Sequence, residues 1–283
     1  MLSQSDILMT VDFDRTFTAC NGSIPQRNLD AIRDFTAAGG AFTINTGRSA
    51  VNFADHLDLP VNAPFLLCNG AAAYENGQVS QCVPIEVDLW EMVDTLHSLF
   101  PELDLEIQGV DCHYLVDPTE KVLELYKNVG WNWKRAEKGL DMGPFIKLVF
   151  YGQPHKPSVS NFYEATSEEK ARFDEAEETV KRLYGDKVSV FRAAPRILNI
   201  HGPGVSKLAA ARTLQKRLGK KLLICVGDAQ NDIPMLDGAD YAFCPSDGAI
   251  ADQYENVCPC DDGAIADVIY NKIPKILQKL NNP

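Results

Sequence analysis

Two carboxylates and a hydroxyl alternate along one short stretch, Asp12-x-Asp14-x-Thr16, directly after the apolar run 7–11. Side chains of an extended segment alternate between two faces, so Asp12 and Asp14 are expected to point the same way. Two adjacent acids can divide catalytic work, one attacking as a nucleophile while the other transfers protons. The same residues would also serve as turn residues after an ordinary strand, so this motif alone leaves both interpretations open.

A second acidic loop follows the apolar run 221–226. It begins at Gly227-Asp228, and Asn231 and Asp232 precede an expected helix that starts at residue 233. Carboxylate oxygens of this kind suit a hard cation such as Mg²⁺. The alternative is that Asp228 and Asp232 only form a turn and begin the helix.

Lys207 lies in the first turn of an expected helix over residues 205–218. A lysine there is unfavourably placed in the field of the helix dipole, which indicates an anionic partner, although a solvated surface lysine is the commoner case. Each pair of like charges about 4 Å apart costs on the order of 4 kcal/mol at a dielectric constant near 20. A phosphate could therefore bind beside the acids of both loops only if a divalent cation and Lys207 offset the negative charges.

Strand and helix patterns alternate in the first and last parts of the chain. Such alternation predicts right-handed βαβ units and a parallel sheet, whose ligands bind at the carboxyl ends of the strands. Four apolar strands end there in a polar residue, and these residues are expected to converge on one edge of the sheet: Asp12, Thr46, Asn69 and Asp228. The expected strands are 7–11, 41–45, 64–68, 221–226 and 241–244, and the expected helices are 25–38, 205–218 and 265–280.

The middle of the chain has a different pattern, with strands in pairs separated by helices. It predicts an inserted α+β domain with an open, mainly antiparallel sheet. The fold class is therefore α/β, a Rossmann-like parallel-sheet core at 1–84 and 195–283 with an α+β cap domain at 85–194. The expected strands of the insertion are 103–107, 112–116, 145–151 and 188–191, and its helices are 88–100, 118–129 and 168–184.

Composition limits the kinds of protein that this chain can be. Its 283 residues are 45% hydrophobic and 23% charged, as in an ordinary globular protein, and the net charge of -12 argues against nucleic acid as a partner. No apolar run approaches the roughly 20 residues of a membrane span and no signal-peptide pattern is present, so a cytoplasmic monomer that does not bind membranes is expected. Cys258-Pro-Cys260 is the one close pair among eight cysteines. With no Cys or His cluster nearby in sequence, a zinc site is not expected there.

The motifs, taken in order, resemble the haloacid dehalogenase superfamily of phosphatases: Asp12-x-Asp14-x-Thr16, Thr46, Lys207 and Gly227-Asp228-x-x-Asn231-Asp232. The insertion resembles the type IIB cap of Cof-type sugar-phosphate phosphatases, and the resemblance spans essentially the whole chain. One departure is that Arg15 and Phe17 stand where Cof-type members usually have glycine and a small or aliphatic residue. The bulky Arg15 is expected to narrow the entrance to the site or to touch the substrate.

The resemblance implies a role for each matched residue. Asp12 would be the nucleophile that forms an aspartyl-phosphate, and Asp14 the acid and base for the leaving alcohol and the hydrolytic water. Lys207 would neutralise the charge that develops on the phosphoryl group. The implied phosphate-binding residues are Asp12, Phe13, Asp14, Thr46, Gly47, Lys207 and Asn231. The implied Mg²⁺ ligands are Asp12, Asp14 (through its carbonyl) and Asp228, with Asp232 ordering the ligand waters or Lys207, while Thr16 supports the loop.

Other polar and aromatic residues are weaker candidates. Arg48 and Asn69 would meet the substrate, or else belong to ordinary loops and turns. His113, Tyr114, Trp131 and Trp133 would line a specificity surface, but such residues are more often core, and His201 is more often structural.

The predicted function is a Mg²⁺-dependent phosphatase that hydrolyses small phosphate esters, with sugar phosphates expected. One alternative is a phosphomutase of the phosphomannomutase type, which shares the same core. The other alternative, from a different class, is a non-catalytic phosphosugar-binding protein, against which the intact pair Asp12 and Asp14 argues.

Overall fold

The computed structural model describes residues 1–152 and 164–282, which form two compact units. The first unit comprises Met1–Gly47, His56–Ser80 and Ser206–Pro283, and the second comprises Arg48–Asp55 and Gln81–Val205. The chain therefore leaves the first unit twice, briefly at 48–55 and for much longer at 81–205. Among the described residues no helix combines the length and the apolar character needed to cross a bilayer.

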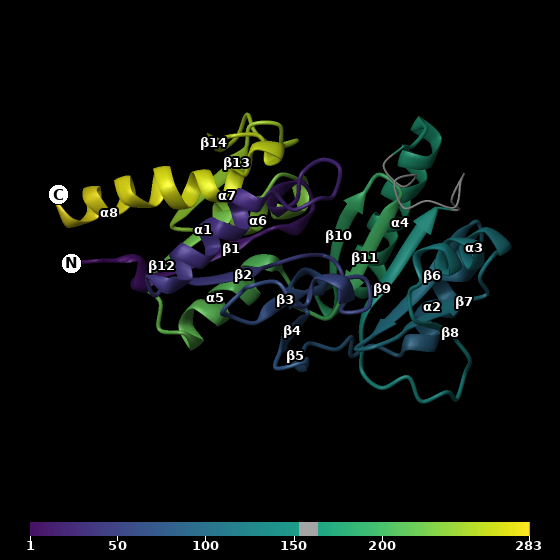
Figure 1. Cartoon of the computed structure of the whole chain (residues 1–283). Coiled ribbons are helices and arrows are strands. Elements are labelled where there is room, and N and C mark those ends of the chain that lie inside the picture. Colours follow the sequence, from purple (N-terminus) through teal and green to yellow (C-terminus); the bar gives the residue numbers. More distant parts are fainter. Residues whose placement is uncertain (153–163, 283) are drawn as a thin grey trace. The chain divides into compact units, whose positions relative to one another are not determined.

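The first unit is built on a five-stranded parallel sheet with the order β14-β13-β12-β1-β2 (Figure 1). At its centre, Met9 of β1 pairs with Ile224 of β12 on one side and with Phe42 of β2 on the other. This parallel arrangement is the one that the βαβ pattern predicts. Its strands are β1 (Ile7–Val11), β2 (Ala41–Ile44), β12 (Leu222–Val226), β13 (Tyr241–Pro245) and β14 (Glu255–Val257).

Both faces of the central strands are buried, as their uninterrupted apolar sequences require. On one face, Leu8 and Leu223 pack with residues of α5 (Lys207–Arg217) and α6 (Ile233–Asp237). Their neighbours Met9 and Ile224, which point to the opposite face, are also fully buried. Helix α1 (Gln26–Ala37) contacts β2 and α7 (Ala264–Asp267).

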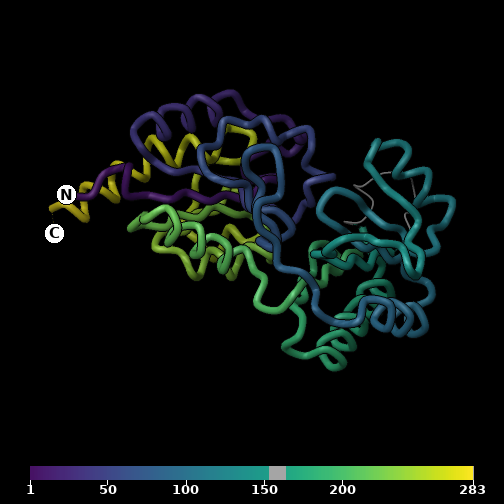
Figure 2. The backbone as a smooth tube through the Cα atoms, turned by 90° about the horizontal axis from the view of Figure 1, so that it is seen from below, coloured from purple at the N-terminus to yellow at the C-terminus, as the bar shows by residue number. Residues whose placement is uncertain are grey.

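The helix predicted over 265–280 is present at the C-terminus, and it contains one π-helical turn. It consists of α7, a wide turn at Val268–Lys272, and α8 (Ile273–Asn281). Pro274 at the start of α8 has no N–H to donate, so the regular α-helical hydrogen bonding changes at this point without ending the helix. The end of α8 lies beside the N-terminus, where Leu2 N–H donates to Asn281 Oδ1 at 2.7 Å (Figure 2).

A small sheet with the order β3-β4-β5 completes the first unit. The Asn76-Gly77 turn joins β4 and β5 with φ of 54° and 80°, the left-handed conformations that such a hairpin turn requires. Strands β4 and β5 therefore form a β-hairpin. The strands are β3 (Phe65–Leu67), β4 (Ala72–Glu75) and β5 (Gln78–Cys82).

The second unit has a six-stranded, mostly antiparallel sheet with the order β10-β11-β9-β6-β7-β8. The predicted open antiparallel sheet is thus present, but β8 and β11 were missed. Strand β11 pairs with β9 and β10, so this unit continues past the expected boundary at residue 194. Its strands are β6 (Leu103–Gly109), β7 (His113–Val116), β8 (Trp133–Arg135), β9 (Phe145–Gly152), β10 (Ser189–Ala194) and β11 (Ile197–His201).

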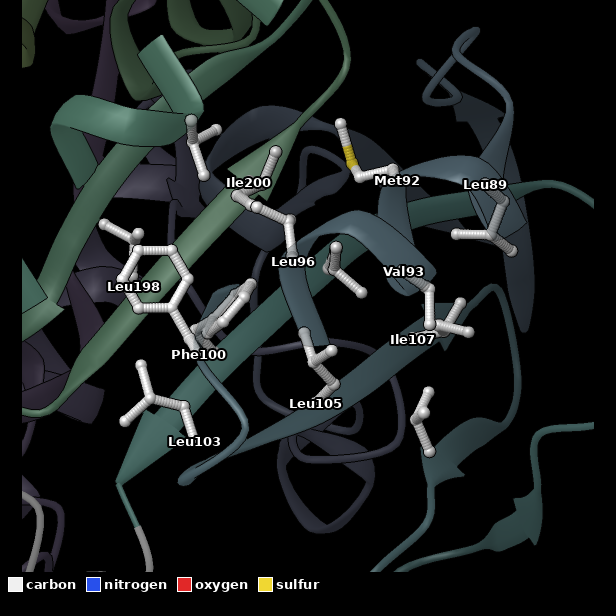
Figure 3. Close-up of a cluster of buried hydrophobic side chains, with 14 of the residues drawn as sticks. Leu89, Met92, Val93, Leu96, Phe100, Leu103, Leu105, Ile107, Leu198 and Ile200 are labelled. Carbon is white, nitrogen blue, oxygen red and sulfur yellow. The ribbon is translucent and has the colours of Figure 1, made fainter. Parts of the chain in front are cut away.

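One face of this sheet is apolar and packs on helices α2 (Leu89–Leu99) and α4 (Ser167–Tyr184). Leu96 and Phe100 meet Leu105 and Leu198 in this core (Figure 3). A smaller cluster on α3 (Glu120–Val129) includes Tyr126. The alternate residues of β6, β9 and β11 are polar yet buried: Asp104, Glu106, Gln108, Lys147, Asn199 and His201.

Candidate active site

The candidate site lies at the carboxyl ends of the central strands of the first unit. Asp12 directly follows β1, and its N–H donates to Val226 O at 2.9 Å, at the end of β12. Asn45, which follows β2, donates its N–H to Val11 O at 2.8 Å. Adjacent strands therefore end at the same level, which brings Asp12 beside Asp228.

The chain turns sharply after Asp12, because Thr18 N–H donates to Phe13 O at 2.9 Å. Arg15 in this turn has a φ of 57°, in the left-handed region that disfavours residues with a Cβ. Glycine would adopt this conformation without strain. The turn also directs Thr16 Oγ1 to Asp228 Oδ1, to which it donates at 3.0 Å.

Lys207 is the first residue of α5 and links the carboxylates of the site. Its ammonium group donates to Asp12 Oδ1 and, at 2.7 Å, to Asp232 Oδ1. Asn45 Nδ2 donates to Lys207 O at 2.9 Å and fixes the start of the helix. The sequence did not single out Asn45, because an amide at the end of a strand gives no sign of a partner 162 residues away.

Gly70 allows this helix to approach the turn after β3. Its φ is 92°, and a Cβ there would lie 2.6 Å from Ala210 Cβ and 2.7 Å from Ser206 O. No other residue type fits without moving the start of α5, which carries Lys207.

Both oxygens of Asp232 are already engaged within the site. Oδ1 accepts from Lys207, and Oδ2 accepts the N–H groups of Asp228 and Ala229 at 3.1 Å each. A Cβ on Gly227 would lie 2.6 Å from Asp232 Cβ, so only glycine fits at this position. Asp232 therefore holds the loop and the lysine in place.

The site carries more negative than positive charge. Burial raises the pKa of the Asp12 carboxyl well above its ordinary value; Lys207 opposes this shift, while Asp232, Asp228 and Asp14 add to it. Burial and the Asp232 carboxylate raise the pKa of Asp228 to about 7. Burial lowers the pKa of Lys207, but Asp12 and Asp232 outweigh this effect and raise it. One ammonium group thus faces three buried carboxylates.

This donor set suits a hard divalent cation. One carboxylate oxygen from each of Asp12, Asp228 and Asp232 lies within 4.8 Å of the other two. Because Asp232 has both oxygens engaged, Asp12 and Asp228 are the carboxylates better placed to bind a cation. Oxygen ligands and excess negative charge are what Mg²⁺ requires.

The structure brings other predicted residues of the first unit to the same edge. Thr46 N–H donates to Leu66 O, and Asn69 N–H donates to Thr46 O, both at 2.9 Å. A Cβ on Gly47 would lie 3.1 Å from Asn69 Oδ1, so this backbone and the amide side chain are close. Phe13 is buried, Asp14 and Asn231 are partly exposed, and all three lie in the loops that carry Asp12 and Asp232.

The remaining candidates belong to the second unit. Arg48 is there, with Nη1 donating to Asn52 O at 3.5 Å. His201 is fully buried; burial and Lys147 lower its pKa to about 3. Its ring shares a hydrogen bond of 3.1 Å with Ile146 O, which agrees with a structural role.

His113 belongs to a buried polar network of the second unit, the Glu106 network (Ser49, Glu106, His113 and Tyr126). Its Nε2 lies 2.7 Å from Ser49 Oγ, and its Nδ1 lies 3.0 Å from the Tyr126 hydroxyl oxygen. The Tyr126 hydroxyl donates to Glu106. Sequence reasoning missed Glu106 and Tyr126, because the alternating polar residues of β6 (Asp104, Glu106 and Gln108) are typical of a strand with one face in solvent.

The aromatic candidates Tyr114, Trp131 and Trp133 all contribute to packing in the second unit. Tyr114 is buried in the large apolar core, and the two tryptophans pack against the smaller cluster. Trp131 lies edge-on to the Tyr126 ring, with centroids 5.5 Å apart. These contacts agree with the core interpretation of the aromatic residues.

Residues 9–249 match the model of the haloacid dehalogenase-like hydrolase family. The chain belongs to this family. It is 23% identical over 236 residues to M6_Spy0533 of Streptococcus pyogenes serotype M6, a protein named as a candidate phosphatase, covering 81% of this chain and 83% of the relative. The fold resembles that of BT1666 from Bacteroides thetaiotaomicron, with a TM-score of 0.74 and 19% identity over 94% of this chain and 95% of that one. It also resembles the subclass IIB sugar phosphatase BT4131, with a TM-score of 0.72 and 18% identity over 96% of this chain and 98% of that one.

The family expected from the motifs is therefore confirmed. The fold class, a parallel α/β core with an inserted α+β unit, is confirmed as well, and so is the prediction of an enzyme that hydrolyses its substrate. These matches support a phosphatase.

Proposed function

We propose that the protein is a Mg²⁺-dependent phosphomonoester hydrolase that acts on small phosphorylated metabolites through an aspartyl-phosphate. The observation that carries this proposal is the position of Asp12, which is buried, bonded to Lys207 and adjacent to Asp228. A nucleophile, a cation-binding carboxylate and a positive charge are the parts that phosphoryl transfer requires. Sugar phosphates are the proposed substrates, because BT4131, a protein of similar fold, is named as a sugar phosphatase.

The reaction proceeds in two displacements at phosphorus. A carboxylate oxygen of Asp12 attacks the phosphorus atom, the bond to the ester oxygen breaks, and Asp14 gives its proton to the leaving alcohol. Asp14 then takes a proton from water, whose oxygen attacks phosphorus and breaks the bond to Asp12. Inorganic phosphate leaves, and both carboxyl groups return to their starting states.

Other residues of the first unit hold the phosphoryl group. Lys207 supplies the positive charge, and its ties to Asp12 and Asp232 fix it before the substrate arrives. Thr46, Asn231 and the backbone N–H groups of Phe13 and Gly47 are the proposed hydrogen-bond donors to the phosphoryl oxygens. Asp12, Asp228 and the Asp14 carbonyl would hold Mg²⁺, which when bound offsets the negative charge shared by the phosphate and the carboxylates.

The covalent step is the feature to test. With a radiolabelled phosphate ester and Mg²⁺, acid quenching should trap label on the wild-type protein, and more of it on Asp14→Asn, which lacks the base for hydrolysis. Asp12→Asn should trap none, whereas Asp30→Asn, which alters a surface acid of α1, should behave as wild type. Label on Asp12→Asn, or an active enzyme without trapped label, would exclude Asp12 as the nucleophile.

The two alternative functions differ from hydrolysis in their products. A hydrolase releases inorganic phosphate from p-nitrophenyl phosphate and from sugar phosphates. A phosphomutase returns the sugar phosphate with its phosphate moved, and needs a bisphosphate activator. A sensor binds the sugar phosphate and leaves it intact. Product analysis with a panel of phosphorylated metabolites distinguishes the three functions.

A further inference from the structure

A second group of ligand-type side chains lies in the first unit, formed by Cys20, Cys260 and Asp247. Cys20 Sγ and Cys260 Sγ are 3.5 Å apart although 240 residues separate them in sequence. Asp247 Oδ2 accepts from both thiols, at 3.2 Å from Cys260 Sγ and 3.6 Å from Cys20 Sγ. Three donor atoms from three separate segments thus form a small triangle.

The backbone holds this triangle in place independently of the sulfur atoms. Cys260 N–H donates to Asp247 Oδ1 at 3.0 Å, and Cys20 N–H donates to Asp261 Oδ1 at 2.7 Å. Asp261 Oδ1 is also 3.7 Å from Cys260 Sγ, which places a fourth donor beside the triangle. Cys260 is buried, whereas Cys20, Asp247 and Asp261 are exposed, so a cation can enter from solvent.

The spacing fits tetrahedral coordination by a thiophilic metal ion. Zinc–sulfur bonds of about 2.3 Å and zinc–oxygen bonds of about 2.0 Å place two sulfur ligands about 3.8 Å apart, and a sulfur and an oxygen ligand about 3.5 Å apart. The distances of 3.5, 3.2 and 3.6 Å in the triangle lie within a few tenths of an ångström of those values. A cation could therefore enter after small shifts of the side chains.

We propose that Cys20, Cys260 and Asp247 form a second metal site, specific for a zinc-type divalent cation, with Asp261 or water as the fourth ligand. Thiolates select Zn²⁺ over Mg²⁺, whereas the carboxylate site around Asp12 offers oxygen alone. The sequence did not predict zinc here, because the close pair Cys258-Pro-Cys260 has no cluster of ligands nearby along the chain. The fold supplies the missing cysteine from the loop that follows the Asp12 turn.

A disulfide between the two thiols is the competing use of this pair. It would bring the sulfur atoms to about 2.05 Å and remove both thiol protons, so that Asp247 Oδ2 would lose the two S–H donors that it now accepts from. The neighbouring carboxylates also oppose formation of the thiolate that disulfide exchange needs, whereas a cation is stabilised by both carboxylates and thiolates. A carboxylate beside both sulfur atoms therefore favours metal binding over a disulfide.

Cobalt binding tests the site without reference to catalysis. Reduced, metal-free protein in excess Mg²⁺ is titrated with Co²⁺, and thiolate-to-cobalt charge-transfer absorption is recorded. We expect one equivalent of Co²⁺ to produce this absorption and one equivalent of Zn²⁺ to remove it. Cys258→Ser, which changes a cysteine two residues away from the site, should bind as wild type, while Cys20→Ser/Cys260→Ser should give no absorption.

Two further variants keep the test decisive. Asp247→Asn retains both thiols and should bind Co²⁺ at least roughly tenfold more weakly. This variant tests the site even if the double serine variant does not fold. Asp12→Asn should give the wild-type cobalt spectrum, so failure of the metal site and failure of the proposed catalytic mechanism are distinguishable. Absence of the absorption in wild type, its persistence in the double variant, or a thiol count showing a Cys20–Cys260 disulfide would overturn the proposal.

Discussion

Each unit buries a cluster of polar groups, and the two clusters balance their charges in opposite ways. In the first unit, Asp12, Asp228 and Asp232 share one lysine, so the cluster has an excess of negative charge. In the second unit, the single carboxylate Glu106 receives the Tyr126 hydroxyl and the Gln108 amide and lies 3.2 Å from His113 Nδ1.

This difference in charge balance indicates that the Glu106 network stabilises the fold, whereas the cluster around Asp12 is arranged to bind a ligand. A buried carboxylate with several hydrogen-bond donors is satisfied by the protein itself. Buried like charges that face one cation are destabilising until a second cation arrives. The three carboxylates around Lys207 thus lower the stability of the metal-free protein, whereas the Glu106 network does not.

The largest difference between the clusters should appear in catalysis. Asp12→Asn is expected to lower kcat by at least ~10³-fold, since it removes the proposed nucleophile. It should also raise the melting temperature of the metal-free protein, because one of three buried like charges is lost. Steady-state kinetics and thermal unfolding of the same preparation check both effects. Retained activity would contradict the proposed mechanism.

Magnesium should stabilise only the first cluster. At a concentration 100 times its Kd, Mg²⁺ adds about 2.7 kcal/mol to the free energy of unfolding. Asp228→Asn should lose this gain and Glu106→Gln should keep it. Thermal unfolding across a Mg²⁺ titration measures the effect, and an equal gain in wild type and Asp228→Asn would remove Asp228 from the metal site.

Glu106→Gln should destabilise the protein with little direct effect on phosphoryl transfer. The new amide group turns an N–H toward the Tyr126 hydroxyl or the Gln108 amide, and a buried mismatch of this kind costs ~2 kcal/mol. Glu124→Gln, on an exposed position of α3, is the matched control and should be neutral. Urea unfolding of both variants measures the loss of stability. Equal midpoints for Glu106→Gln and Glu124→Gln would show that the Glu106 network does not stabilise the protein.

Two buried groups, Asp228 of the first unit and His201 of the second unit, should respond to pH in opposite directions. The Asp228 pKa is about 7 in the folded state against 3.8 ordinarily, so the folded state holds the extra proton and the metal-free protein loses stability as pH rises from about 4 to 7. The His201 pKa is about 3 against 6.5, so the unfolded state holds the extra proton and stability falls as pH drops below 6.5. Each group contributes at most about 1.4 kcal/mol per pH unit. Asp228→Asn should remove the first trend and His201→Gln the second, as melting temperatures measured across this pH range will show.

The smallest expected effect concerns the backbone at Arg15. Arg15→Gly should stabilise the protein by up to about 1 kcal/mol, because its φ of 57° strains any residue with a Cβ. Arg15→Ala loses the same charge but keeps the Cβ, so the difference between the two variants isolates backbone strain. Denaturant unfolding provides the measurement. If Arg15 also binds substrate, both variants should raise KM equally.

Much of the first unit could be predicted from the sequence, because its signals are local. Apolar strands such as 7–11, followed by acids and then by helices, predict both the parallel sheet and the edge where Asp12 lies. The second unit was less predictable. Strand β8 has only three residues, too few for a clear pattern, whereas β11 does alternate, with the polar residues Asn199 and His201 next to the apolar Leu198 and Ile200, and this short pattern was missed. The C-terminal helix was predicted correctly, and Pro274 is a local signal of the π-helical turn within it.

The sequence by itself determined the family, the parallel core and the acids that follow its strands, because strand period and βα order force those residues to one edge. Only the tertiary structure decided which polar groups meet. Both oxygens of Asp232 accept hydrogen bonds, the Tyr126 hydroxyl donates to Glu106, and the thiols of Cys20 and Cys260 lie in contact. Such contacts join segments far apart in the chain, and their geometry depends on how packed elements place each side chain, which no local pattern records.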